Sequence, residues 1–174
     1  RRRQSEDLLH LATRDSLTGV LNRRQFLSLA TLAAQRDAID ESGYSILFFD
    51  LDRFLTVNAN FGPLAGDEVL KSIGRNLTDH FRKSDLIGRY SGEAFCVLLS
   101  STTAEEALKL AERFCEKIRS TAIRFQESEI HVTISAGVAS TDATAFSLDD
   151  VLRNAENALR QSKENGRDRA TLYR

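Results

Sequence analysis

The sequence predicts an α/β domain in which a mixed central sheet is flanked by helices. Segments with the 3.6-residue apolar period of a helix alternate with short, nearly continuous apolar segments that are typical of buried strands. Two of these strands are separated by only three residues, Ser91 to Glu93, which predicts one hairpin within the sheet. With 174 residues and a hydrophobic fraction of 41%, the chain suffices for one domain with a substantial core.

The first thirteen residues carry leucines among charges and are predicted to be the end of an incoming helix. Two interpretations of this helix are open at this point. Either it connects the domain to an upstream sensor or membrane domain, or it packs back onto its own domain. We therefore treat residues 1–13 as an incoming linker helix and residues 14–174 as the domain itself.

Between the linker and the hairpin, the pattern predicts a turn, two helices and one strand. The segment from Asp15 to Gly19 is rich in turn residues, and a helix from Arg23 to Ala38 follows it. The segment from Tyr44 to Leu51 is almost entirely apolar, as expected for a strand that is buried on both faces. From Leu64 to Arg82, apolar residues fall at helical spacing and predict the second helix.

The second half of the chain continues the alternation. The hairpin strands are expected at Leu86–Tyr90 and Ala94–Leu99, and apolar residues from Ala104 to Ile118 mark the next helix. Alternating apolar residues predict a strand from His131 to Ala139. A last helix begins near Leu148, and Gly166 is expected to close it, because glycine readily adopts the left-handed conformation that ends helices.

Charge and composition exclude several classes of protein. A formal net charge of −1 excludes a globally basic binder of nucleic-acid polymers, and no apolar run approaches the roughly 18 residues of a membrane span. Cys96 and Cys115 lack CxxC spacing and lie in apolar patterns, so we expect buried, reduced thiols in the cytoplasm or in the cytoplasmic part of a membrane-anchored sensor. His10, His80 and His131 show no metal-ligand spacing.

Three carboxylates are candidates for metal chemistry. Asp50 and Asp52 end the buried strand, and the two-residue alternation of a strand places both on one face. Glu93, at the hairpin tip, approaches Asp50 if the two strands are neighbours. Carboxylates from different strands that bridge a metal ion to phosphate are common in phosphoryl-transfer sites. The alternative is that Asp50 and Asp52 only terminate the strand and accept hydrogen bonds from a turn.

Five sequence blocks, spread from Asp15 to Arg169, resemble in their order the blocks of the GGDEF family of bacterial diguanylate cyclase domains. They are Asp15-Ser-Leu-Thr-Gly-Val-Leu-Asn-Arg-Arg, Phe49-Asp-Leu-Asp-Arg-Phe followed by Asn58, Phe61-Gly-Pro-Leu-Ala-Gly-Asp-Glu-Val-Leu, Arg89-Tyr-Ser-Gly-Glu-Ala-Phe, and Ala158-Leu followed by Lys163 and Gly166-Arg. Each block alone is a weak signal, whereas the ordered set covers nearly the whole chain. The resemblance implies a nucleotidyl-cyclase-like fold with a ferredoxin-like palm.

The resemblance also implies a reaction and its partners. Active members join two GTP molecules across a head-to-head homodimer, in which each domain contributes one GTP with bound Mg²⁺. Each 3′-hydroxyl attacks the α-phosphate of the other GTP, which forms cyclic di-GMP and releases pyrophosphate. Neighbouring domains of a longer chain are further expected partners.

Site residues follow from the resemblance by position. It assigns the metal to Asp50, the Leu51 carbonyl and Glu93, the guanine base to Asn58 and Asp67, and phosphate oxygens to Lys163 and Arg167. An amide and a carboxylate suit the acceptor edge and the N–H donors of guanine. Lys163 and Arg167 are four residues apart and would be neighbours if the helix persists, although a solvated helix end also favours cations.

The departures from the family pattern matter for activity. Leu55 stands where the family carries a Lys that is thought to stabilise charge on the phosphate, and Ala94 replaces the fourth signature residue, normally Glu. Ala59 and Pro63 replace Asp and His, while Ser91 for the first signature Gly is a mild change. Loss of one aimed donor typically costs about 2.7–4 kcal/mol of transition-state stabilisation. We therefore expect a catalytically inactive or nearly inactive domain.

A second ligand site is expected beside the hairpin. Arg82-Lys83-Ser84-Asp85 matches the RxxD pattern, and Asp85 lies six residues before Ser91. In the family, an RxxD at this distance is the inhibitory site for cyclic di-GMP, and Arg113 matches the place of a second arginine. The alternative is an ion pair at a helix end, which contributes little stability on a surface.

Three functions are therefore compared. The first and preferred hypothesis is a degenerate signalling domain that binds cyclic di-GMP at the RxxD site, or GTP at the retained half-site, and regulates a neighbouring domain. The second is an active diguanylate cyclase that makes cyclic di-GMP from two GTP. The third is a dimerisation module without a ligand.

Overall fold

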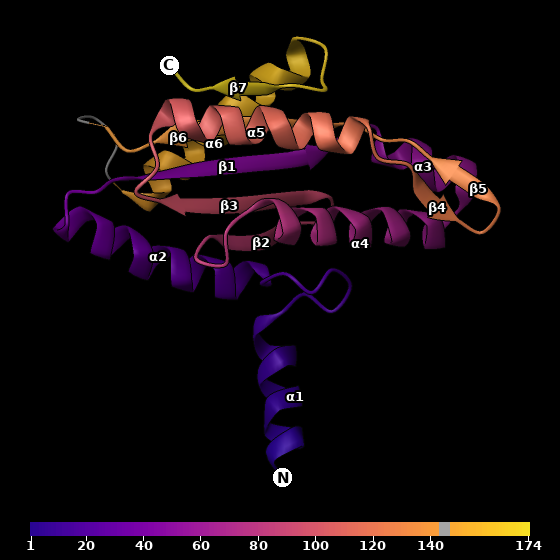
Figure 1. The fold of residues 1–174 in the computed structure, drawn as a ribbon, viewed down its shortest axis with the longest axis horizontal. Helices are drawn as coiled ribbons and strands as arrows, with labels where there is room; N and C mark the ends of the chain where they lie inside the picture. Colours follow the sequence, from indigo (N-terminus) through magenta and orange to yellow (C-terminus); the bar gives the residue numbers. More distant parts are fainter. Residues whose placement is uncertain (143–146) are drawn as a thin grey trace.

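The computed structural model describes residues 1–142 and 147–174 and contains a five-stranded mixed sheet (Figure 1). The central strand, β1 (Tyr44–Leu51), pairs antiparallel with β3 (Ala94–Ser100) on one side and with β6 (Ile134–Ser140) on the other. Outside β3 lies β2 (Leu86–Ser91), and outside β6 lies β7 (Ala170–Leu172), which is parallel to β6. The predicted fold class, a mixed sheet flanked by helices, is confirmed.

Helices cover both faces of the sheet. Every residue of β1 is buried, and the side chains of the strand alternate between two hydrophobic clusters. Leu47 and Phe49 face one cluster, together with α4 (Pro63–His80) and α5 (Ala104–Arg119). Ile46 and Phe48 face the other, together with α2 (Arg23–Ile39) and α6 (Leu148–Glu164). This division explains why the sequence of β1 is almost entirely apolar.

Side-chain caps lie at the starts of three helices, and these helices begin where the sequence predicts helix starts. Asn22 accepts a hydrogen bond from the backbone N–H of Gln25 at the start of α2. Thr103 and Glu106 form a reciprocal capping box at the start of α5, and Ser147 caps α6. Gly166 follows the end of α6 with φ +116°, as expected for a residue that closes a helix.

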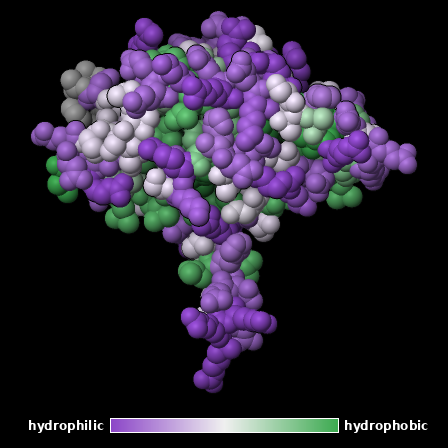
Figure 2. Space-filling model, in the orientation of Figure 1, coloured by the Kyte–Doolittle hydropathy of each residue, from purple (hydrophilic) through white to green (hydrophobic). Residues whose placement is uncertain are grey.

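The first helix, α1 (Arg2–Thr13), projects away from the body of the molecule, as Figures 1 and 2 show. The prediction of a helix is confirmed, and none of its residues is buried. Its leucines at positions 8, 9 and 11 are about two-thirds exposed. The interpretation that the helix packs back onto its own domain is therefore wrong, whereas its role as a linker stays a prediction.

Several short elements differ from the prediction. A separate helix, α3 (Phe54–Phe61), precedes α4, and Gly62, with φ +91°, separates the two helices. The strand expected from His131 begins only at Ile134, because β4 (Ile123–Phe125) and β5 (Ser128–Ile130) form a small two-stranded sheet just before it. Strands of three residues carry too few side chains to show a period.

Both cysteines are free and buried, as predicted. Burial raises the pKa of the Cys115 thiol to about 12 and that of Cys96 well above its usual range, so neither is a reactive thiolate at neutral pH. Among the described residues, no helix combines the length and apolar character that crossing a membrane requires.

Candidate functional site

The site lies at the end of β1 where four segments meet. These are the last residues of β1, the turn between β2 and β3, the start of α3, and the end of α6 with the turn that follows it. We call the group Asp50, Leu51, Glu93 and Lys163 the β1 edge site. The register brings its members together, because Asp50 lies opposite Ala94, the residue after Glu93.

Asp50 has one paired and one unpaired carboxylate oxygen. Lys163 of α6 forms an ion pair with Oδ2. Oδ1 is buried and finds no hydrogen-bond partner in the described part of the chain. A buried acceptor without a partner is costly, so this oxygen suits a ligand that the protein itself does not supply.

Glu93 lies beside Asp50, as expected for neighbouring strands. The backbone N–H of Leu51 donates to the Glu93 carbonyl at 3.2 Å. Burial and the charge of Asp50 raise the pKa of the Glu93 carboxyl, and the charge of Lys163 only partly offsets them. Two close carboxylates that share one lysine fit an oxygen-seeking divalent cation such as Mg²⁺, although the described residues contain no ready cluster of three such metal ligands.

Asp52 has a different environment from Asp50. It is 6% exposed, and its carboxylate accepts hydrogen bonds from the Thr133 hydroxyl at 2.7 Å and the Ser135 hydroxyl at 2.6 Å. The backbone N–H of Asp168 donates to it at 3.1 Å. For Asp52 the alternative interpretation, a strand end that accepts hydrogen bonds from a turn, is therefore confirmed.

The two residues predicted to read guanine lie on facing helices. Asn58 is on α3, and Asp67 is on α4 directly after Gly66. The Oδ1 atom of Asn58 is buried without a hydrogen-bond partner among the described residues. A Cβ atom added to Gly66 would lie 2.0 Å from it, so only glycine allows Asn58 to occupy this place. An amide and a half-buried carboxylate are thus available where α3 and α4 meet.

Lys163 and Arg167 were expected to be neighbours only if the helix persists to Arg167, and the structure does not meet that condition. The α6 helix ends at Glu164, and Gly166, Arg167 and Asp168 all have positive φ angles, of 116°, 66° and 50°. Arg167 is exposed on this turn. The tight turn sets its position, since the helix has ended before it. Lys163 instead contacts the metal candidate Asp50.

Of the five departures from the family pattern, Leu55 and Ala94 are the two on which the expected loss of activity rests. Leu55 is in the first turn of α3 and is 79% exposed. Ala94 is buried directly opposite Asp50 in the antiparallel pair, where facing Cβ atoms are about 5 Å apart. A methyl group therefore occupies the position from which a carboxylate would reach the same cation.

The hairpin turn is held by an arginine that sequence reasoning did not single out. The Arg89 guanidinium donates to the Gly92 carbonyl at 2.7 and 3.1 Å and to the Asp15 carboxylate at 3.2 Å. Burial opposes ionisation of Asp15, but hydrogen bonds from Thr18 and the charge of Arg89 outweigh it and lower the pKa of Asp15. Both residues belong to the quoted sequence blocks, which was the available signal.

The RxxD residues follow the end of α4 and contact each other. The Arg82 guanidinium lies 3.1 Å from the buried Asp85 carboxylate, and the backbone N–H of Arg82 donates to the same group at 2.9 Å. The Arg82 side chain is nevertheless largely exposed. Arg113 is exposed on α5. Burial is the main cause that lowers the pKa of His80, two residues before Arg82, and the charges of Lys117 and Arg113 lower it further.

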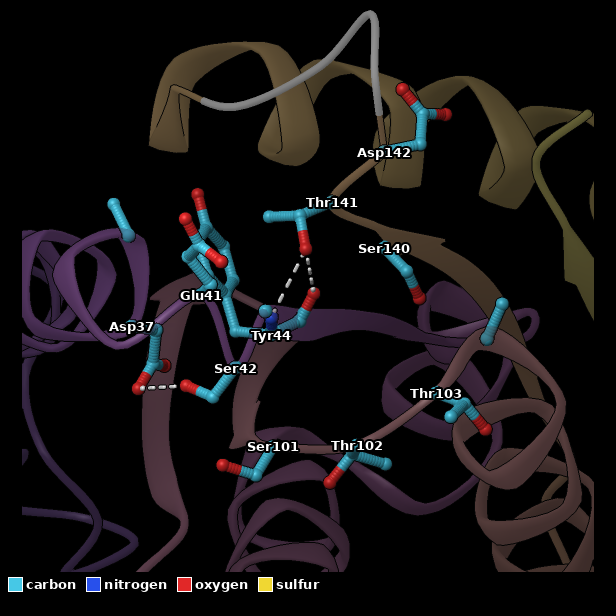
Figure 3. Close-up of a pocket in the computed structure, with 13 residues that line it drawn as sticks. Asp37, Glu41, Ser42, Tyr44, Ser101, Thr102, Thr103, Ser140, Thr141 and Asp142 are labelled. Atoms are coloured by element: carbon cyan, nitrogen blue, oxygen red, sulfur yellow. Dashed lines mark hydrogen bonds between the residues drawn. The ribbon is translucent and has the colours of Figure 1, made fainter.

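A cavity of about 690 Å³ lies at the other end of the sheet, beside the start of β1 and the ends of β3 and β6 (Figure 3). Hydroxyl-bearing residues are the commonest in its lining, where Thr141 accepts from the Tyr44 backbone N–H and Ser42 donates to Asp37. None of the residues predicted to bind ligand or metal lines it, although Arg82 donates to Thr102 on its wall at 3.3 Å. The cavity is thus separate from the β1 edge site.

The fold and the geometry of the site together define a nucleotidyl-cyclase-like α/β domain. Residues 12–169 match the family model described as diguanylate cyclase, GGDEF domain. The chain therefore belongs to the GGDEF family.

Named relatives agree with this assignment. The chain is 35% identical over 173 residues to diguanylate cyclase A of Treponema denticola and 37% identical over 169 residues to diguanylate cyclase DgcM of Escherichia coli K12. Each match covers 97% of this chain but only 46% and 40% of the relatives, so the chain spans less than half of their length. The solved coiled coil and GGDEF domain of DgcB from Caulobacter crescentus, in complex with cyclic di-GMP, superimposes with a TM-score of 0.91 at 24% identity, over 98% of this chain and 91% of that one.

Proposed function

We propose that the domain binds GTP with a divalent cation at the β1 edge site and forms cyclic di-GMP across a pair of domains, as a slow diguanylate cyclase. The observation that carries the proposal is that Oδ1 of Asp50 is buried and has no hydrogen-bond partner among the described residues. Beside it, burial and the charge of Asp50 raise the pKa of the Glu93 carboxyl. Both features suit a cation-binding pair. The relatives named diguanylate cyclases support this activity over the inactive domain that the signature alone suggests.

Each residue of the proposed site has a distinct task. Asp50, the Leu51 carbonyl and Glu93 hold the cation, which when bound supplies positive charge to the triphosphate. Asn58 and Asp67 bind the guanine edge, while Lys163 and Arg167 bind phosphate oxygens. Lys163 is paired with Asp50 in the structure, and its ammonium group would be available to the phosphates if a cation took its place beside Asp50.

The proposed rate is low because the Lys and the Glu of the family pattern are absent at positions 55 and 94. The exposed Leu55 cannot donate to a phosphate, and Ala94 offers no carboxylate opposite Asp50. Each loss corresponds to about 10²–10³ in rate, and the two losses are not strictly additive.

A chromatographic product assay tests the proposal. Purified protein is incubated with GTP and Mg²⁺ or Mn²⁺, and cyclic di-GMP is expected to form slowly. Asp50→Ala should abolish it, whereas Asp37→Asn, which changes a buried aspartate at the other end of the sheet, should leave it intact. Absence of product over long incubation, with folded protein, would refute the cyclase.

A second candidate function is a cyclic di-GMP receptor, which the exposed Arg82 beside a buried Asp85 favours. Arg82 would fork or stack on a guanine, and Asp85 would accept from its N–H groups. Calorimetry with cyclic di-GMP should then give binding that Arg82→Ala removes without affecting GTP binding. Binding together with slow product formation identifies the RxxD site as a product-inhibition site, whereas binding without product identifies a receptor alone.

A further inference from the structure

The turn after α6 depends on a residue that is distant in sequence. Arg167 and Asp168 both adopt left-handed φ angles, which disfavour non-glycine residues, so neighbouring contacts must hold them there. On one side, the Arg167 backbone N–H donates to the Ser162 carbonyl at 2.9 Å. On the other side, the Asp168 backbone N–H donates to the carboxylate of Asp52 at 3.1 Å.

Asp52 is itself fixed rigidly. Its carboxylate accepts from the hydroxyls of Thr133 and Ser135, and its own backbone N–H donates to the Thr133 carbonyl at 3.0 Å. The Ser135 hydroxyl also accepts from the Asp168 backbone N–H, at 3.2 Å. One buried carboxylate therefore ties together the end of β1, the start of β6 and the turn that carries Arg167.

We infer that Asp52 is a positioning residue that places Arg167 for the nucleotide phosphates. This inference rests on the proposed binding of GTP at the β1 edge site. Asp52 is two residues from Asp50, so the same short segment provides a candidate metal ligand and the anchor of the phosphate-binding turn. Because its oxygens are engaged by three donors, Asp52 acts through the turn and leaves the metal to its neighbours.

Phosphate and base affinities separate this role from a general structural one. With Mg²⁺ present, calorimetry compares GTP with guanosine, which lacks phosphates and depends on Asn58 and Asp67. Asp52→Asn is expected to weaken GTP binding about tenfold or more, the order of one charge-assisted hydrogen bond, and to leave guanosine binding within about twofold. In an Arg167→Ala background, Asp52→Asn should cause no further loss, because the residue that it positions is gone.

Two controls keep the test decisive. Asp37→Asn removes another buried carboxylate, at the far end of the sheet, and should change neither affinity. If Asp52→Asn does not fold, Ser135→Ala removes one donor to the same carboxylate and carries the same comparison. Equal losses for GTP and guanosine, or an undiminished loss in the Arg167→Ala background, would overturn the inference alone, whereas wild-type protein that binds no GTP would overturn the proposed function as well.

Discussion

At the scale of single residues, positions 55 and 94 are where the proposed site lacks two charged groups of the family pattern. Leu55 presents an aliphatic side chain at the start of α3, and Ala94 places a methyl group opposite Asp50. Ala94 keeps its place opposite Asp50 in the β1–β3 pairing, and Leu55 lies within the regular helix α3. The missing groups are therefore open to restoration in an intact frame.

Restoring both groups should raise activity. We predict that Leu55→Lys and Ala94→Glu each increase the rate of cyclic di-GMP formation by about 10²–10³, because each returns charge aimed at the cation or the phosphate. Initial rates at saturating GTP measure the effect. Leu32→Lys, which also adds a lysine in place of an exposed leucine but on α2, is the matched control and should have no effect. Unchanged rates in both restored variants would contradict the prediction.

Glu93 makes the stability of the free protein depend on pH. Its folded pKa is raised above 4.5 by burial and by Asp50, so its charged form opposes folding. The stability linked to this group is complete below the pKa of the unfolded chain and is lost as pH rises through the folded value. We predict that Glu93→Gln unfolds at a higher temperature than wild type at neutral pH, and that the difference disappears near pH 4.

Thermal unfolding at the two pH values checks this prediction. Addition of Mn²⁺ at neutral pH should stabilise the wild type more than the variant, because the cation compensates the carboxylates that repel each other. If Glu93→Gln is less stable than wild type at neutral pH without metal, the charged Glu93 carboxylate does not destabilise the folded protein, and the prediction is wrong.

At the scale of elements, the predicted bounds were most accurate where the apolar pattern extends over many residues. Strand β1 matches its predicted bounds, and α5 and α6 differ by a residue or so, because many side chains contribute to each pattern. The short strands β4, β5 and β7 were missed because three residues define no period. The approach of Glu93 to Asp50 was foreseen only on the condition of strand adjacency, which the structure meets. The closeness of Lys163 and Arg167 was foreseen only on the condition that the helix continues, which the turn at Gly166 rules out.

One contact between elements is so close that only glycine fits. A Cβ atom added to Gly137 on β6 would lie 2.1 Å from the Ala155 carbonyl of α6. We predict that Gly137→Ala destabilises the domain by about 1–3 kcal/mol or more through overpacking, measured by denaturant unfolding. Gly92→Ala is the control, because a Cβ atom there meets no atom within 4 Å. Equal stabilities of the two variants would contradict the proposed close packing of α6 on the sheet.

At the scale of the whole molecule, the proposed reaction requires two domains. Each β1 edge site offers one set of ligands for one GTP, so the second reactant must come from another copy. We predict that specific activity rises with protein concentration over a roughly hundredfold range and then levels off as dimers saturate. Initial rates at fixed GTP check this, and a specific activity that is independent of concentration down to the lowest measurable level would indicate that dilution does not separate the copies.

The projecting α1 helix has a mechanical consequence for the rest of the molecule. None of the residues of α1 is buried, yet the segment that follows it is hydrogen-bonded to the hairpin. Leu21 exchanges backbone hydrogen bonds with Ile87 and Arg89. The Arg89 side chain donates both to the Asp15 carboxylate and to the Gly92 carbonyl. A rotation of α1 about its axis would meet little resistance from the body until it reached this segment. Torque on α1 would therefore reach the start of α2 through Asn22, which donates to the Ala12 and Thr13 carbonyls, and would reach the turn that carries Glu93 through Asp15, Leu21 and Arg89.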